Sequence, residues 1–184
     1  MIDPMFRDWS DFYLFVGSAA AVLIGLIFVV ISLMQDRSRS SVLAGSKLYM
    51  GPIVLSVSFV LALSGAALAP GITEPRFAVI AGIIAVWGLA RGVMSTLGMW
   101  RLGSGREIHW SDAWFYGVIP SLLYVALGAV AVAIANRFGW AADGLALAIM
   151  GILLCAIRNE WDLITWIAPR RDAPEPDFEA ADQD

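Results

Sequence analysis

Residues 12–34 read FYLFVGSAAAVLIGLIFVVISLM and contain no charged side chain. A helix needs about 20 mostly apolar residues to cross the hydrocarbon core of a bilayer. This stretch is long enough, and it is too long for the apolar region of a cleaved signal peptide. It therefore predicts a membrane-spanning helix that remains in the protein.

Four further stretches have the same character, and we expect a helix over each: 48–69, 77–99, 113–135 and 140–168. The last is apolar to about residue 157 and continues through charged residues, because no Gly or Pro interrupts it before Pro169. The connections are short. The sequence therefore predicts an all-α fold: one polytopic five-helix transmembrane bundle over residues 1–169. Pro120 removes one backbone hydrogen bond from the fourth helix, and we expect a kink there.

Composition supports the same class. Of the 184 residues, 59% are hydrophobic and 15% are charged, against about 45–50% and 25% in soluble domains. This excludes a soluble enzyme and a nucleic-acid-binding protein, so no nucleic-acid partner is expected. One Cys and one His make neither an internal disulfide nor a typical zinc site. No HExxH, GxSxG or phosphate-loop pattern is present. We therefore expect neither an enzyme nor a cofactor.

The distribution of Lys and Arg predicts the orientation, since cytoplasmic loops carry the excess of these residues. One side would hold Arg37, Arg39, Lys47, Arg101, Arg106, Arg158, Arg170 and Arg171. The other side would hold Arg7, Arg76 and Arg137, with Arg91 inside the membrane. The N-terminus is therefore predicted outside and the C-terminus in the cytoplasm. Eleven Arg against one Lys suggest a GC-rich bacterial genome, so the expected location is the bacterial inner membrane.

Residues 170–184 form a separate region. From residue 172 onward they contain six acidic residues, no basic residue and one aromatic side chain, Phe178. Such a segment cannot bury enough apolar area to fold alone. We expect an acidic disordered tail, with a short docking motif around Phe178 as the alternative.

Small residues recur four positions apart in two of the predicted helices: Gly17, Ala21 and Gly25 in the first, and Gly88 and Gly92 in the third. This spacing lets two helix backbones approach closely. We interpret both sets as packing faces inside the bundle, with a homo-oligomer interface as the alternative. Replacing Gly25 with Leu should then destabilise the protein more than replacing Leu23 with Ile.

Four charged residues form a candidate intramembrane cluster: Arg91, Arg158, Glu160 and Asp162. Arg158 and Asp162 are four residues apart and can pair on one helix. Glu160 points away from them, and we hypothesise that it pairs with Arg91, with Asp162 as the fallback partner. The alternatives are that Arg91 snorkels to the headgroups, that it belongs to a polar pathway, or that residues 158–166 form an amphipathic helix end at the interface.

Residues 17–33 (GSAAAVLIGLIFVVISL) and 158–163 (RNEWDL) resemble a diffuse group of short, largely uncharacterised bacterial membrane proteins. These proteins have a similar small-residue first helix and an Asn-x-Trp-Asp-Leu motif near the last helix. Some of them are labelled modulators of a membrane-bound AAA protease. The resemblance implies a membrane protein of similar design. It carries over no catalytic or ligand-binding residue.

Two functions are compatible with these features. The first is a non-enzymatic accessory or regulatory protein that contacts lipid and either a membrane protein partner or further copies of itself through its helices. The alternative is a small oligomeric channel or transporter with a polar pathway near the cytoplasmic side. Between Arg91 and the outer surface the main polar candidates are Ser56, Ser58, Ser64 and Tyr124. So few polar groups favour the accessory function.

Overall fold

The computed structural model describes residues 4–33, 51–102 and 114–167. These residues form helices and no strand. In chain order the elements are α1 (Pro4–Arg7), α2 (Ser10–Leu33), α4 (Gly51–Leu68), α5 (Glu74–Leu102), the π-helix η2 (Trp114–Val118), α7 (Ile119–Ala135) and α8 (Ala141–Ile167). Five spans are long and apolar enough to cross a membrane, with η2 and α7 together forming one of them. The predicted all-α, five-helix transmembrane fold is confirmed.

Several sequence-based predictions concern other parts of the chain. The acidic tail at 170–184 lies outside the described residues. The same holds for residues 48–50 of the second predicted helix and for the basic residues Arg37, Arg39, Lys47 and Arg106.

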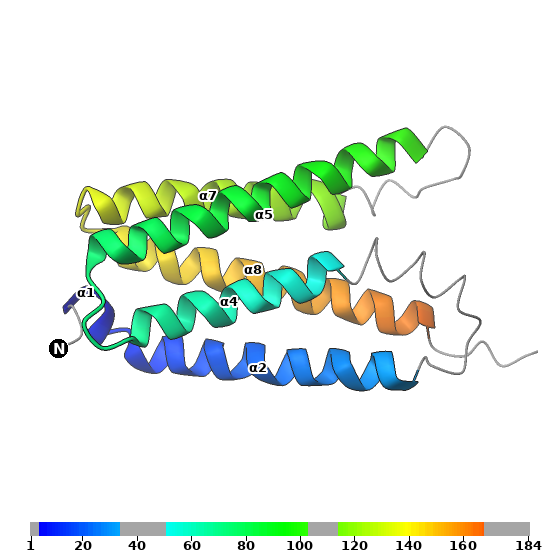
Figure 1. The fold of residues 1–184 in the computed structure, drawn as a ribbon, viewed down its shortest axis with the longest axis horizontal. Coiled ribbons are helices and arrows are strands. Elements are labelled where there is room, and N and C mark those ends of the chain that lie inside the picture. Colours follow the sequence, from blue (N-terminus) through cyan, green and yellow to red (C-terminus); the bar gives the residue numbers. More distant parts are fainter. Residues whose placement is uncertain (1–3, 34–50, 103–113, 168–184) are drawn as a thin grey trace, which may run out of the picture.

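The five long helices run alternately up and down (Figure 1). We name the two ends of the bundle after residues that lie there. The Gly51 end is where α2, α5 and α8 finish and where α4 and η2 begin; the Glu74 end carries α1 and the turns between α4 and α5 and between α7 and α8. Helix α8 contacts α2, α4 and α7, whereas α5 packs mainly on α7 and to a smaller extent on α4.

Two turns at the Glu74 end follow from local sequence. The α4–α5 turn contains Pro70, which cannot continue a helix hydrogen-bond pattern, and Gly71, which adopts φ +75°. The α7–α8 turn places Arg137 at φ 57°. The Arg137 Nε atom lies 2.9 Å from Glu74 Oε2, so an ion pair links the two turns.

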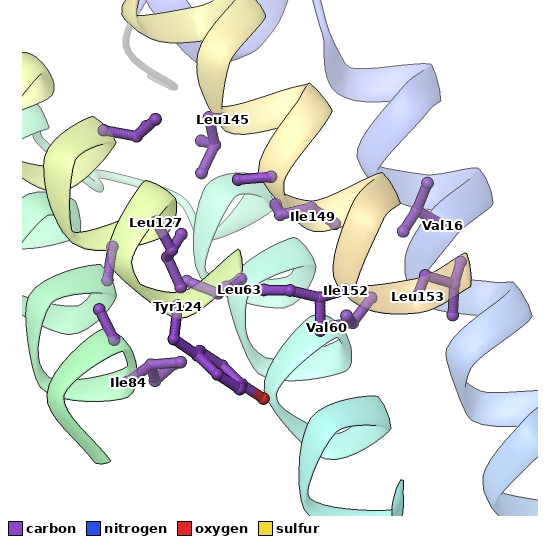
Figure 2. Close-up of a cluster of buried hydrophobic side chains, with 14 of the residues drawn as sticks. Val16, Val60, Leu63, Ile84, Tyr124, Leu127, Leu145, Ile149, Ile152 and Leu153 are labelled. Carbon is purple, nitrogen blue, oxygen red and sulfur yellow. The ribbon is translucent and has the colours of Figure 1, made fainter. Parts of the chain in front are cut away.

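The largest fully buried side chains lie mainly in the half of the bundle nearest the Glu74 end. Leu63 of α4, Leu127 of α7, and Leu145 and Ile149 of α8 are each 0% exposed, and they meet at the centre of the bundle (Figure 2). Val16 of α2 is also fully buried. This half of the bundle is a close-packed core that is largely apolar, with the buried Tyr13 and Ser64 hydroxyls as exceptions.

The outward surface is apolar as well. Leu14, Phe15, Val86, Leu122 and Leu147 are each at least 60% exposed. Large apolar side chains at that exposure are expected where a helix faces lipid acyl chains. Apolar residues therefore lie both inside and outside, and the position of the small and polar residues determines how the helices pack.

The predicted small-residue face of α5 packs against α7. A Cβ built on Gly88 would overlap the ring of Tyr124, and one built on Gly92 would lie 2.5 Å from Ser121 Oγ. One turn further along, Gly117 of η2 meets Thr96 of α5 in the same way. The requirement for glycine is strictest at Gly88, which faces the Tyr124 ring itself; at Gly92 the close atom is a hydroxyl oxygen that can rotate, and the next atoms of Ser121 lie 3.5 Å away.

The predicted packing face of α2 needs correction. Gly17 is buried, and a Cβ there would lie 3.0 Å from Ser64 Cβ. Ala21 and Gly25 are exposed, and a Cβ on Gly25 would meet no atom within 4 Å. The face turns away because positions 17 and 25 differ by about 80° around a helix that advances about 100° per residue. Within the chain, α2 therefore packs through Gly17 but not through Ala21 or Gly25.

Candidate functional site: a polar cavity near the Gly51 end

The half of the bundle nearest the Gly51 end contains a cavity where α4, α5, η2–α7 and α8 meet. Its volume of about 30 Å³ is enough for about one water molecule. Most of its wall is apolar. The polar side chains that line it are Ser56, Arg91, Tyr116, Tyr124, Cys155 and Asn159.

Asn159 and Pro120 together determine the wall formed by η2 and α8. In the i→i+5 pattern of a π-helix, the carbonyl of Phe115 would accept a hydrogen from the backbone nitrogen of residue 120. Residue 120 is proline, which has no N–H. The Asn159 side chain supplies the donor instead, with Nδ2 2.9 Å from the Phe115 carbonyl oxygen. Asn159 is 5% exposed, so this bond pairs a buried side-chain amide with the carbonyl of the half-buried Phe115.

Tyr116 makes a second connection between η2 and α8. Its buried hydroxyl lies 3.2 Å from the Asn159 carbonyl oxygen and 3.1 Å from Asp162 Oδ2. A phenol has one hydrogen to donate, so it can be shared between these acceptors. The Asp162 carboxylate is exposed, which places this contact at the edge of the bundle rather than in its core.

Tyr124 lines the cavity from the α7 side. Its hydroxyl lies 3.0 Å from Ser56 Oγ on α4, and its ring stands edge-on to Phe59 with centroids 6.1 Å apart. Gly88 of α5 lies directly against the ring. Tyr124 therefore connects α4, α5 and α7 at the level where the apolar core gives way to the cavity.

The hypothesised Arg91–Glu160 pair is wrong. Glu160 is 5% exposed, and its Oε2 atom has no hydrogen-bond partner among the described residues. Arg91 is exposed on α5. The physical reason is the order of the helices: α4 and α7 are the main neighbours of α5, and they separate it from α8. The fallback pair of Arg91 with Asp162 fails for the same reason.

The expected pairing of Arg158 with Asp162 is also wrong. The Arg158 guanidinium carbon lies 3.3 Å from the centroid of the Phe115 ring, which is a cation–π contact. Its Nη1 atom lies 3.3 Å from Asn159 Oδ1. The π-helix brings Phe115 and Tyr116 against α8, and these residues contact the two charges separately.

Of the four predicted cluster residues, Arg91 alone lines the cavity. Arg158 and Asp162 instead contact two residues of its wall, Asn159 and Tyr116 respectively. Sequence reasoning did not select Tyr116 or Asn159. The sequence feature that points to Asn159 is Pro120. Because proline has no N–H, a carbonyl about one turn before it needs another donor, and a side-chain amide can supply one. In the described ranges, no group of three or more His, Cys, Asp or Glu is placed to bind a metal ion.

The cavity can hold a small polar or anionic group, because its wall offers hydroxyls, an amide and one guanidinium but no carboxylate among the described residues. Among the described residues of this wall, the hydrogen-bond partners of Cys155 are the Phe115 carbonyl and the Asn159 amide, and neither is a basic nitrogen. Comparisons of the chain with protein-family models, with curated proteins and with solved structures found no match.

Proposed function

We propose that this protein is a non-enzymatic accessory or regulatory protein of the bacterial inner membrane. It acts by docking the outward face of α2 on a membrane-spanning helix of a partner protein. We call this face, formed by Ser18, Ala21 and Gly25, the α2 small-residue face.

The exposure of the α2 small-residue face carries this proposal. Its three residues are exposed, and a Cβ on Gly25 would meet nothing within 4 Å. Small residues on a lipid-facing surface leave a shallow strip into which another helix can pack closely. The neighbouring Val22 and Leu26 are 63% and 50% exposed and would form one wall of that strip.

The interior supports docking rather than transport. The described residues nearest the Glu74 end form a close-packed core around Leu63, Leu127 and Leu145, as Figure 2 shows. The cavity lies on the other side of Tyr124 and accommodates about one water molecule. A solute would therefore have to displace packed side chains in order to cross.

The orientation is part of the proposal, with the N-terminus outside. Helices α2, α5 and α8 all finish at the Gly51 end (Figure 1). The basic residues that follow or close these helices therefore belong to one side of the membrane. Because the excess of Lys and Arg marks the cytoplasmic side, the Gly51 end would face the cytoplasm.

The experiment compares two lipid-facing glycines. Gly25→Leu fills the α2 small-residue face, and Gly65→Leu is the matched control on α4, where an added Cβ also meets nothing within 4 Å. We expect Gly25→Leu to lower the recovery of the native complex in mild detergent at least about tenfold, since bulk separates helix backbones. Gly65→Leu should leave recovery unchanged, and both variants should keep the melting temperature of the parent.

Mass measurement of the complex identifies its members. A complex whose mass is a multiple of the chain's own mass would show that the α2 small-residue face binds further copies of this chain rather than a partner protein. Equal recovery for both variants would contradict the docking face. The resemblance of residues 17–33 and 158–163 to modulators of a membrane-bound AAA protease makes such a protease the first partner to test.

A second candidate function is a small oligomeric channel or transporter. The observation that favours it is the polar cavity with Arg91 in its wall, together with the buried Glu160 carboxylate. Proteoliposomes loaded with a chloride- or proton-sensitive dye test it directly. Flux that depends on Arg91 or Glu160 would support transport over docking.

A further inference from the structure

Arg91 is a cation without an anionic partner among the described residues. It is exposed on α5, and the only ion pair among the described residues is that of Arg137 with Glu74 at the opposite end of the bundle. Its Nη2 atom lies 3.7 Å from the position of a Cβ on Gly51. The guanidinium therefore reaches the level at which α4 begins.

The position of Arg91 along α5 gives the depth of this charge. Arg91 is 17 residues after Glu74, where α5 begins, and is therefore about 26 Å along the helix at 1.5 Å per residue. The hydrocarbon core of a bilayer is about 30 Å thick. With Glu74 near one edge of the hydrocarbon, Arg91 lies near the other, and its guanidinium is placed where lipid phosphates begin.

An open groove on the outward surface of α5 adjoins this charge. It has a volume of about 500 Å³ and includes Ile83, Val86, Trp87 and Arg91 in its wall. Most of the apolar members come before Arg91 in the chain and so lie toward the bilayer centre, whereas Met94 lies about one turn beyond it. Trp87 stands edge-on to Phe59 of α4, with ring centroids 6.4 Å apart. The charge therefore lies in the part of the groove nearest the headgroups, and most of the apolar surface extends from it into the membrane.

We propose that this groove binds one anionic phospholipid of the leaflet at the Gly51 end. Its phosphate contacts the Arg91 guanidinium, and one acyl chain lies along Trp87 and Ile83. A guanidinium matches the geometry of a phosphate and can donate two hydrogen bonds to it. Among the described residues that line the groove and the cavity, none carries a carboxylate. The ammonium of a zwitterionic headgroup would therefore find no partner here and would be repelled by Arg91.

The test measures lipid retention by native mass spectrometry of the purified protein. Phosphatidylglycerol and phosphatidylethanolamine with identical acyl chains are offered separately. The parent protein should retain phosphatidylglycerol severalfold more than phosphatidylethanolamine. Arg91→Gln should lower phosphatidylglycerol retention at least about tenfold, because hydrogen bonds to charged groups contribute strongly. Retention of phosphatidylethanolamine should hardly change.

Arg76→Gln is the matched control, since Arg76 is an exposed arginine at the other end of α5. It should leave both lipids as in the parent. Arg91→Lys keeps the charge without the bidentate geometry and should give intermediate retention. Trp87→Ala should weaken phosphatidylglycerol binding without changing the preference between headgroups.

Three results would overturn the proposal. One is equal retention of the two lipids by the parent. Another is an equal loss in Arg91→Gln and Arg76→Gln. The third is displacement of the lipid by millimolar inorganic phosphate, which would show a site for free phosphate rather than for lipid. If Arg91→Gln does not fold, as judged by circular dichroism, the retention of phosphatidylglycerol by Arg91→Lys and Trp87→Ala tests the proposal instead. Retention equal to that of the parent in both variants would contradict it.

Discussion

Replacing Gly88 with Ala tests the closest helix contact in the bundle. The added methyl group would overlap the ring of Tyr124, and the ring cannot move away without cost. Its hydroxyl bonds Ser56 at 3.0 Å, and its edge packs on Phe59. Overpacking costs about 1–3 kcal/mol, and an interhelical hydrogen bond in a membrane contributes about 0.6–1.7 kcal/mol. We therefore expect Gly88→Ala to lower the free energy of unfolding by about 2–4 kcal/mol.

The control is Gly25→Ala on α2. A Cβ there meets no atom within 4 Å, and alanine favours a helix by up to about 1 kcal/mol relative to glycine. Gly25→Ala should therefore be neutral or slightly stabilising. Both variants are measured by reversible unfolding with dodecyl sulfate in mixed micelles, followed by far-ultraviolet circular dichroism. Equal losses for the two glycines would refute the α5–α7 contact and restore the original expectation for α2.

A double-mutant cycle identifies the atoms responsible. Tyr124→Ala removes the ring and is itself destabilising, because it leaves a cavity beside Leu127 and Ile84 in the core shown in Figure 2. In that background the methyl group of Gly88→Ala has space, so the second substitution should cost almost nothing. A loss that stays additive would show that the methyl group acts through the α5 backbone rather than through Tyr124.

Three other predictions use smaller perturbations. Asn159→Leu should lower the free energy of unfolding by about 1–3 kcal/mol, because it removes the amide donor to the partly buried Phe115 carbonyl; in a Pro120→Ala background the loss should shrink, since residue 120 regains a donor, and chemical unfolding measures both. A cysteine at Thr73, which is exposed at the Glu74 end, should react with an impermeant thiol reagent from outside the cell in a Cys155→Ser background; labelling only after the membrane is opened would invert the proposed orientation. Arg137→Gln should change the melting temperature little, because the Arg137 side chain is 77% exposed and such ion pairs contribute about 0–1 kcal/mol.

The five helices could be predicted because each depends on the apolar length of one segment, and this is a local property. The packing face of α5 with Gly88 and Gly92 could also be predicted from the spacing. The contact continues where Gly117 of η2 meets Thr96 of α5. The rotation of α2 could not be predicted. Its spacing defines a face but does not indicate whether that face meets α4 or lipid, since apolar residues cover both sides of the helix.

The candidate site was harder to predict because it depends on which helices are neighbours. Arg91 and Glu160 carry opposite charges toward the same end of the bundle, and sequence alone gives no reason to separate them. The order of the helices separates them. Helix α7 packs on both α5 and α8, whereas α5 and α8 make no extensive contact with each other. Asn159 lies next to Glu160 in the chain, and it determines the wall of the cavity through one hydrogen bond to Phe115.

The position of Pro120 explains why the polar groups that contact η2 lie near the Gly51 end of the bundle. A proline inside a membrane helix leaves backbone carbonyls that lipid cannot satisfy, at a cost of several kcal/mol each if they stay unpaired. The chain places this break near the Gly51 end, where Asn159 donates to one carbonyl and the Tyr116 hydroxyl reaches Asp162 at the exposed edge. The same break in the half around Leu127 and Leu145 would require a further polar partner inside a core that is close-packed and largely apolar. Confining the irregular backbone to the half nearest the headgroups therefore keeps the other half sealed, and it leaves Arg91 beside a small polar cavity at the level of the lipid phosphates.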